Sequence, residues 1–170
     1  MPRIVSVSIV ALAIALGAPA FSATNATLPS SVSASLGSAQ SAADVAALVL
    51  ANPDFAPTIL AQAAALGVAS PPQVLKEAIS PSSSSAAVVD LICAAAEAAP
   101  GQADHSAAAA FSAAGGASRD RLADRIAAAA IDCVERSSSS SEASEVVAAV
   151  HTWKSFVKLP SENQTNPSGN

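Results

Sequence analysis

The sequence predicts an all-α protein, an alanine-rich bundle or array of short antiparallel helices with disordered N- and C-terminal segments. Alanine makes up about a quarter of the 170 residues, and it is the best intrinsic helix former. Only 3% of the residues are aromatic, which disfavours strands. Burial stabilises a fold by only ~0.8 kcal/mol per CH₂ group, so alanine helices must pack closely to build a core.

Residues 1–23 have the pattern of a secretory signal peptide. Arg3 supplies the basic start, an apolar run follows from 4 to 16, and small residues dominate from 17 to 23. An uncleaved transmembrane anchor is the alternative, but about 20 strongly apolar residues are needed to span a bilayer. The pattern therefore predicts a secreted or periplasmic protein with no stable membrane anchor after signal cleavage.

The mature chain is divided by caps and helix breakers into one helical domain over residues 41–159. A Ser/Thr/Ala-rich stretch without periodicity, 24–40, is expected to be a flexible lead-in. Polar residues with Pro and Asn fill 160–170, which is expected to be a disordered tail. Between these segments the sequence predicts helices over 41–51, 56–66, 71–79, 86–99, 102–114, 119–135 and 142–158.

Local signals justify each helix in turn. Ser41 and Asp44 have the spacing of a capping box, and Asn52-Pro53 ends the first helix. The second helix ends at Gly67, and Ser70-Pro71 opens the third, which Ser80-Pro81 ends. Serines open the fourth helix, and Pro100-Gly101 separates it from the fifth, which Gly115-Gly116 closes. Ser118 caps the sixth helix, and the serine run 137–141 separates it from the seventh. The pattern of helix, proline, helix and glycine occurs twice at an offset of about 48 residues, which suggests a helical-hairpin repeat or chance similarity among alanines.

Cys93 and Cys133 are the two cysteines of the chain. An even count in an exported protein favours a disulfide, here between the fourth and sixth helices. The alternative is two separate buried thiols that act as small apolar side chains. In the chain-entropy model, closing a loop of this length stabilises the fold by ~4 kcal/mol. The expected role is structural.

The last helix carries the most concentrated large apolar surface of the mature chain, formed by Val150, Trp153, Phe156 and Val157. These side chains either anchor the helix on the bundle or form an interaction stripe for a protein partner. Asn25 and Asn163 match the N-glycosylation pattern Asn-x-Ser/Thr.

Motifs for catalysis or cofactor binding are not found in the sequence. His105 and His151 lack metal-ligand spacing, and we expect neither a metal nor a cofactor. The net charge of −5 and the scarcity of aromatic residues argue against nucleic-acid binding. We therefore expect an exported, non-catalytic helical protein of structural or protein-interaction type. The alternative is a carrier that holds a lipid or small apolar ligand between helices.

Overall fold

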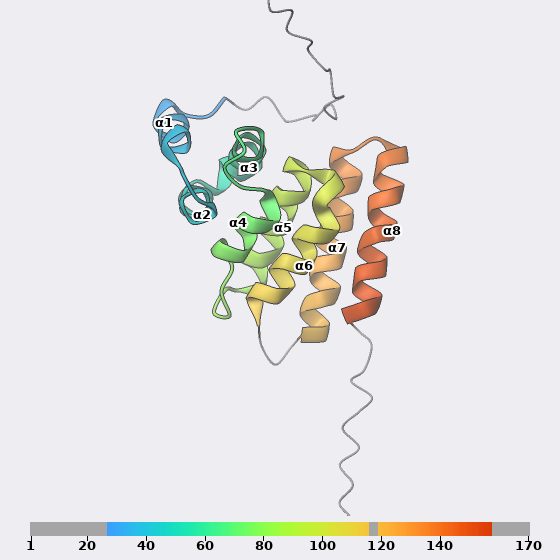
Figure 1. Cartoon of the computed structure of the whole chain (residues 1–170). Helices are drawn as coiled ribbons and strands as arrows, with labels where there is room; N and C mark the ends of the chain where they lie inside the picture. Colours follow the sequence, from blue (N-terminus) through green and yellow to red (C-terminus); the bar gives the residue numbers. More distant parts are fainter. Residues whose placement is uncertain (1–26, 116–118, 158–170) are drawn as a thin grey trace, which may run out of the picture.

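The structure is a computed structural model that describes residues 27–115 and 119–157. The described residues form eight α-helices and two 3₁₀-helices, with no strand among them (Figure 1). The predicted all-α architecture is confirmed. The predicted signal peptide 1–23 and the polar tail 160–170 lie outside the described residues. The helices are α1 (Ser30–Ser38), α2 (Ala42–Ala51), η1 (Pro53–Phe55), α3 (Ala56–Ala65), α4 (Pro71–Ala78), α5 (Ser85–Ala98), η2 (Pro100–Gln102), α6 (Ala103–Ala114), α7 (Arg119–Ser137) and α8 (Ser140–Val157).

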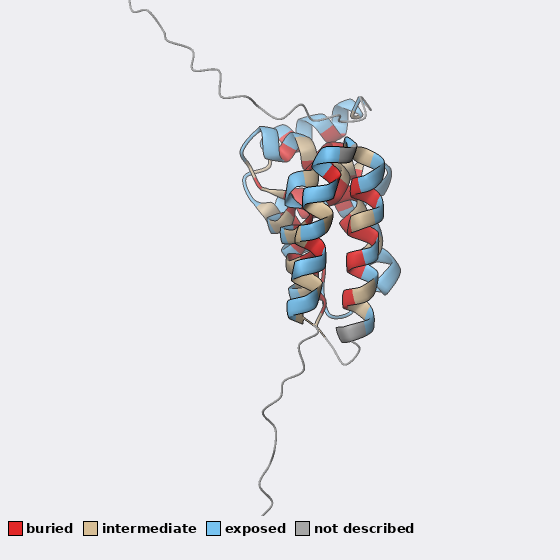
Figure 2. Cartoon of the chain, turned by 90° about the vertical axis from the view of Figure 1, so that its right-hand side faces the viewer, coloured by how far each residue is buried: buried red, intermediate tan, exposed pale blue. Residues whose placement is uncertain are grey.

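The helices form an array in which consecutive helices contact each other, and each of α2–α6 also contacts the next helix but one. Thus α2 contacts α4, α3 contacts α5, α4 contacts α6, α5 contacts α7, and α6 contacts α8. In Figure 1, α6, α7 and α8 run side by side at one end of the molecule, with α1–α3 at the other. Figure 2 shows buried positions on the inner sides of the helices and exposed positions outside.

Alanines make up much of the core, especially on α5 and α6. Ala95, Ala96, Ala103 and Ala107 are completely buried. Because a methyl group occupies little space, these helices approach one another closely. Larger side chains fill the rest of the core, notably Leu36, Ile59, Leu60, Leu75, Ile92 and Ile126.

Residues 24–40 were expected to be a flexible lead-in, but the structure places helix α1 within them. Val32 and Leu36 lie one helical turn apart, are buried, and belong to the main core. Both face α2, the element that α1 contacts. The prediction was wrong for 30–38 because two apolar residues among many serines give too weak a periodic signal. Tertiary burial, rather than local propensity, accounts for this helix.

The internal repeat has a structural counterpart. The unit α2–η1–α3 ends at Gly67, and the unit α5–η2–α6 ends at Gly115. Both glycines have positive φ, +71° and +46°, which L side chains rarely adopt. Asn52 and Ala99, which precede the two prolines, have similar backbone angles, φ/ψ −137/64° and −148/77°. A residue before proline is held out of the helical region, so each proline bends the chain at the same point of its unit.

Within residues 27–115 and 119–157, no single helix is long and apolar enough to cross a bilayer. The pair α2 and η1–α3 would reach the required length together, but it is bent by 116° at the break.

Candidate functional site

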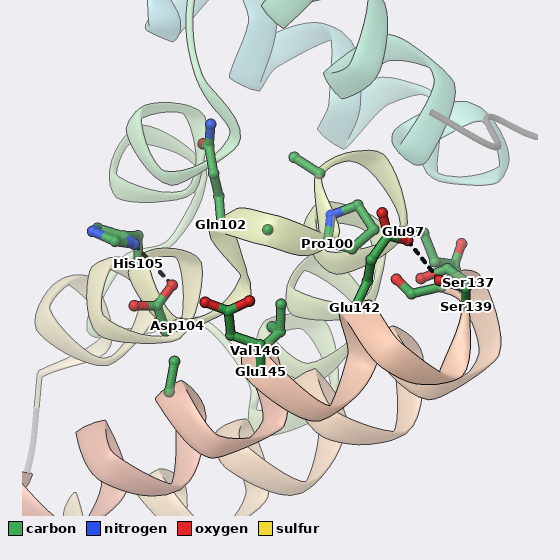
Figure 3. Close-up of a pocket in the computed structure, with 14 residues that line it drawn as sticks. Glu97, Pro100, Gln102, Asp104, His105, Ser137, Ser139, Glu142, Glu145 and Val146 are labelled. Atoms are coloured by element: carbon green, nitrogen blue, oxygen red, sulfur yellow. Dashed lines mark hydrogen bonds and ion pairs between the residues drawn. The ribbon is translucent and has the colours of Figure 1, made fainter. Parts of the chain in front are cut away.

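A pocket of about 630 Å³ lies where the end of α5, η2 and the start of α6 face the first half of α8 (Figure 3). The break at Ala99-Pro100 forms one side of the pocket, because it turns the chain from α5 through η2 into α6. The serine turn after α7 then brings α8 back beside η2, which it contacts. Two stretches of the chain that are distant in sequence, 97–105 and 137–149, therefore share the lining.

Four carboxylates line the pocket. Glu97 comes from α5, Asp104 from α6, and Glu142 and Glu145 from α8 (Figure 3). The apolar part of the lining consists of Ala99, Pro100, Val146 and Ala149. The pocket thus combines an acidic rim with short apolar side chains.

Two of the carboxylates have local structural roles. Asp104 and Glu142 lie in the first turns of α6 and α8, where the positive end of the helix dipole favours an anion. Glu142 accepts a hydrogen bond from Ser139 Oγ at 2.8 Å. Asp104 Oδ1 lies 2.8 Å from Nδ1 of His105, whose side chain is 74% exposed. Their positions in these first turns account for both acids.

Glu97 and Glu145 have no such local structural role. Glu97 lies in the last turn of α5, where the negative end of the helix dipole disfavours an anion. Glu145 lies in the second turn of α8 and points toward the pocket (Figure 3). Among the described residues, no Lys or Arg forms an ion pair with Glu97, Glu142 or Glu145. The pocket therefore holds negative charge that the described part of the chain does not neutralise.

A disulfide joins two of the helices. Cys93 and Cys133 are bonded and join α5 to α7, with their Cα atoms 5.3 Å apart. The predicted pairing is confirmed. Cys133 is completely buried, whereas Cys93 is half-buried. Arg136 lies over the bond, with Nη2 2.9 Å from Cys133 Sγ and 3.8 Å from Cys93 Sγ.

The four residues of the apolar stripe do not lie on one exposed face. Val150 is completely buried, and Trp153 is half-buried with its ring edge-to-face against Phe111, the ring centroids being 5.8 Å apart. Val157 is half-buried, and Phe156 is 70% exposed. Lys154 on the same helix forms an ion pair of 2.8 Å with Asp124 of α7. Most of the stripe thus holds α8 on the array, and Phe156 remains at the surface.

The remaining sequence-derived candidates are dispersed. Asn25 and Asn163 lie outside the described residues. His105 borders the acidic pocket, whereas His151 is exposed on α8 and does not line it. Within residues 27–115 and 119–157, no three His, Cys, Asp or Glu side chains are placed to hold a metal ion.

Sequence reasoning missed the acidic pocket. Its carboxylates are separated by up to 48 positions and form no motif. The available signal was the Pro100-Gly101 break followed by an acidic first turn, beside a final helix that also begins with acidic residues. Comparison of the chain with protein-family models, curated proteins and solved structures gave no significant match.

Proposed function

We propose that this chain is an exported, non-catalytic helical protein that binds another protein, and that the acidic pocket receives a cationic side chain of that partner. The observation that carries the proposal is the pocket itself. It is lined by four carboxylates, and none of them forms an ion pair with Lys or Arg within the described residues.

Glu97 supports a binding role most directly. A carboxylate in the last turn of a helix is disfavoured by the helix dipole, and here it faces other carboxylates rather than a cation. Like charges held together raise the free energy of the isolated protein. A bound ammonium or guanidinium group would relieve this repulsion, and the negative potential would also steer a basic partner toward the pocket.

The apolar part of the lining fits the same ligand chemistry. Lysine and arginine carry three or four methylene groups below the charged head, and these stems pack on apolar surface while the charge stays near water. Ala99, Pro100, Val146 and Ala149 offer such a surface beside the carboxylates. A fatty acid or other anionic lipid would instead bring its negative charge toward four acids. The lining therefore favours a basic protein segment over the lipid-carrier alternative.

Export rests on the signal-peptide pattern of 1–23, and the disulfide between Cys93 and Cys133 is compatible with it. Disulfides persist in secreted and periplasmic proteins and are rare in the reducing cytosol. On this proposal the partner is met outside the cytoplasm.

Peptide titration followed by NMR tests the pocket. A short lysine- and arginine-containing peptide is added to isotope-labelled mature protein, with a Gly/Ser peptide of equal length as the neutral control. We expect the basic peptide alone to shift amide signals around Glu97, Gln102, Asp104 and Glu145, and the shifts to shrink with added salt.

The matched variants are Glu97→Gln with Glu145→Gln, and Glu77→Gln with Glu135→Gln. Both pairs remove two negative charges, but the second pair lies on exposed positions of α4 and α7 outside the pocket. We expect the first pair to weaken binding about tenfold, since each lost charge contact contributes up to ~1 kcal/mol, and the second pair to change it little. Equal weakening by both pairs, or shifts spread over every acidic surface, would refute the proposal.

A further inference from the structure

The two sulfur atoms of the disulfide have different surroundings. Cys133 is completely buried on α7, whereas Cys93 on α5 is half-buried. An attacking thiolate must approach one sulfur from the side opposite the sulfur that leaves. Cys93 is the more exposed of the two cysteines, so we expect an external thiol to attack there rather than at Cys133.

The leaving sulfur has a cation beside it. Nη2 of Arg136 is 2.9 Å from Cys133 Sγ, closer than its 3.8 Å to Cys93 Sγ. Arg136 is held there through its own helix turn, because Nε donates to the Asp132 carbonyl at 3.3 Å and Nη2 lies 3.3 Å from Asp132 Oδ2. A guanidinium in this position stabilises negative charge on the sulfur of Cys133.

We propose that Cys93 is a site of S-thiolation by low-molecular-weight thiols, and that Arg136 promotes the reaction by stabilising Cys133 as the leaving thiolate. The sulfur of the attacking thiolate bonds to Cys93 Sγ, the bond between Cys93 and Cys133 breaks, and its electron pair stays on Cys133. A second thiolate then attacks the mixed disulfide at the sulfur of the small thiol. This step releases the oxidised small disulfide and leaves both cysteines reduced, one of them after taking up a proton from water.

The different surroundings of the two sulfur atoms give the disulfide a role beyond cross-linking, as a site of modification. The mixed disulfide on Cys93 removes the covalent link between α5 and α7, which then stay together by packing alone, while Arg136 still lies beside the sulfur of Cys133. Because Glu97 lies on α5 one helical turn beyond Cys93, the modified cysteine is close in sequence to the acidic pocket. The chemistry of the bond does not depend on whether the pocket binds a partner.

The location of the modification is tested with the oxidised mature protein and 2-mercaptoethanol, a neutral thiol that Arg136 does not attract by charge. The reaction is stopped early, free thiols are alkylated with iodoacetamide, and the products are digested with trypsin. Cleavage after Arg125 separates the two cysteines into different peptides. We expect the mercaptoethanol adduct on Cys93 and the alkyl group on Cys133. The adduct on Cys133, or equal amounts on both, would overturn the assignment.

The role of Arg136 is tested by the rate of the first step in Arg136→Gln, Arg136→Lys and the control Arg121→Gln. Arg121 is exposed on the same helix and lies about 18 Å from Cys133, at 1.5 Å per residue over twelve residues. We expect Arg136→Gln to slow the reaction about fivefold, Arg136→Lys to restore part of the rate, and Arg121→Gln to leave it unchanged.

If Arg136 had only a structural role, Arg136→Gln would make the reaction faster rather than slower. If the guanidinium only shields the bond or holds α7 in place, its removal opens the site and reduction becomes faster. An unchanged or faster rate in Arg136→Gln would therefore refute the leaving-group role. The difference between wild type and Arg136→Gln should also shrink at about 1 M salt, because screening weakens a partly exposed charge interaction.

Discussion

At the scale of single residues, Asp44 shows how one side chain starts a helix. Its Oδ2 accepts hydrogen bonds from the backbone N–H groups of Gln40 and Ser41, each at 3.0 Å, and from Ser41 Oγ at 2.9 Å. The Ser41 hydroxyl in turn accepts from the Asp44 N–H at 3.2 Å. The backbone N–H of Gln40, followed by the Ser41 hydroxyl, lowers the pKa of Asp44 below its ordinary value of 3.8. The capping box expected from the spacing of Ser41 and Asp44 is confirmed.

The lowered pKa of Asp44 predicts a pH dependence of stability. A carboxyl whose folded-state pKa is depressed stabilises the fold above its unfolded pKa, and this contribution is lost as the pH falls through the folded pKa. We expect Asp44→Asn to be less stable than wild type near neutral pH, and the difference to shrink at about pH 3 and below.

Thermal unfolding of both proteins across this pH range checks the prediction, with Asp54→Asn as the control. Asp54 is also exposed and lies in η1, so its removal changes the net charge equally. A difference between Asp44→Asn and wild type that stays constant with pH would contradict it.

The individual residues that the sequence could identify are those with a local or pairwise signal. Ser41, Ser70 and Gly67 act within a few positions of themselves, so their roles follow from spacing alone. The bond between Cys93 and Cys133 followed from there being only two cysteines. Arg136 was not identified as its neighbour, because no local pattern links it to the two cysteines and only the three-dimensional structure places it over the sulfur atoms.

At the scale of elements, helices with strong breakers were located well and those without were not. Pro100 and Gly115 delimit α6 as expected from the sequence. The 3₁₀-helices η1 and η2 were not predicted, since three residues give no periodicity to detect. Helix α1 was missed because its two buried residues, Val32 and Leu36, are stabilised by contacts made elsewhere in the array.

Helix α8 gives the clearest prediction at this scale. Trp153 is half-buried against Phe111, whereas Phe156 is 70% exposed on the same helix. We expect Trp153→Ala to lower the free energy of unfolding by about 2 kcal/mol, less than the 3–5 kcal/mol typical of a fully buried aromatic residue. Phe156→Ala should change it by no more than about 0.5 kcal/mol.

Urea unfolding followed by circular dichroism measures both variants, and the two substitutions serve as controls for each other. Each replaces an aromatic side chain by alanine in the last two turns of α8. If Phe156→Ala were the more destabilising, the orientation of α8 on α6 and α7 would have to be different from that described.

At the scale of the whole molecule, the repeated unit explains where the pocket lies. The breaks at Pro53 and Pro100 are equivalent in the two units, but α8 packs only against the second one, through η2. The acidic pocket therefore forms at one of two related corners. Because its lining comes from two stretches that are distant in sequence, 97–105 and 137–149, no local pattern in the sequence could have predicted it, whereas the all-α class followed from composition alone.

The N-terminal pattern predicts that the whole chain is shortened on export. If residues 1–23 direct export, protein recovered outside the cytoplasm of its native host has a shortened N-terminus. Its intact mass should correspond to a chain that starts between Phe21 and Thr24 and is two hydrogens lighter than the reduced form, because of the bond between Cys93 and Cys133. The mass before and after reduction checks both features in one experiment.

Each outcome of the mass measurement has a physical consequence for the array. Loss of the apolar N-terminal run leaves the described helices and their single cross-link as the functional unit, and the acidic pocket is then exposed to partners outside the cytoplasm. A full-length chain with two free thiols would refute both export and the bond. The cross-link between α5 and α7 would then be missing at the corner where Glu97 lies, and α5 would be held beside α7 by side-chain packing alone.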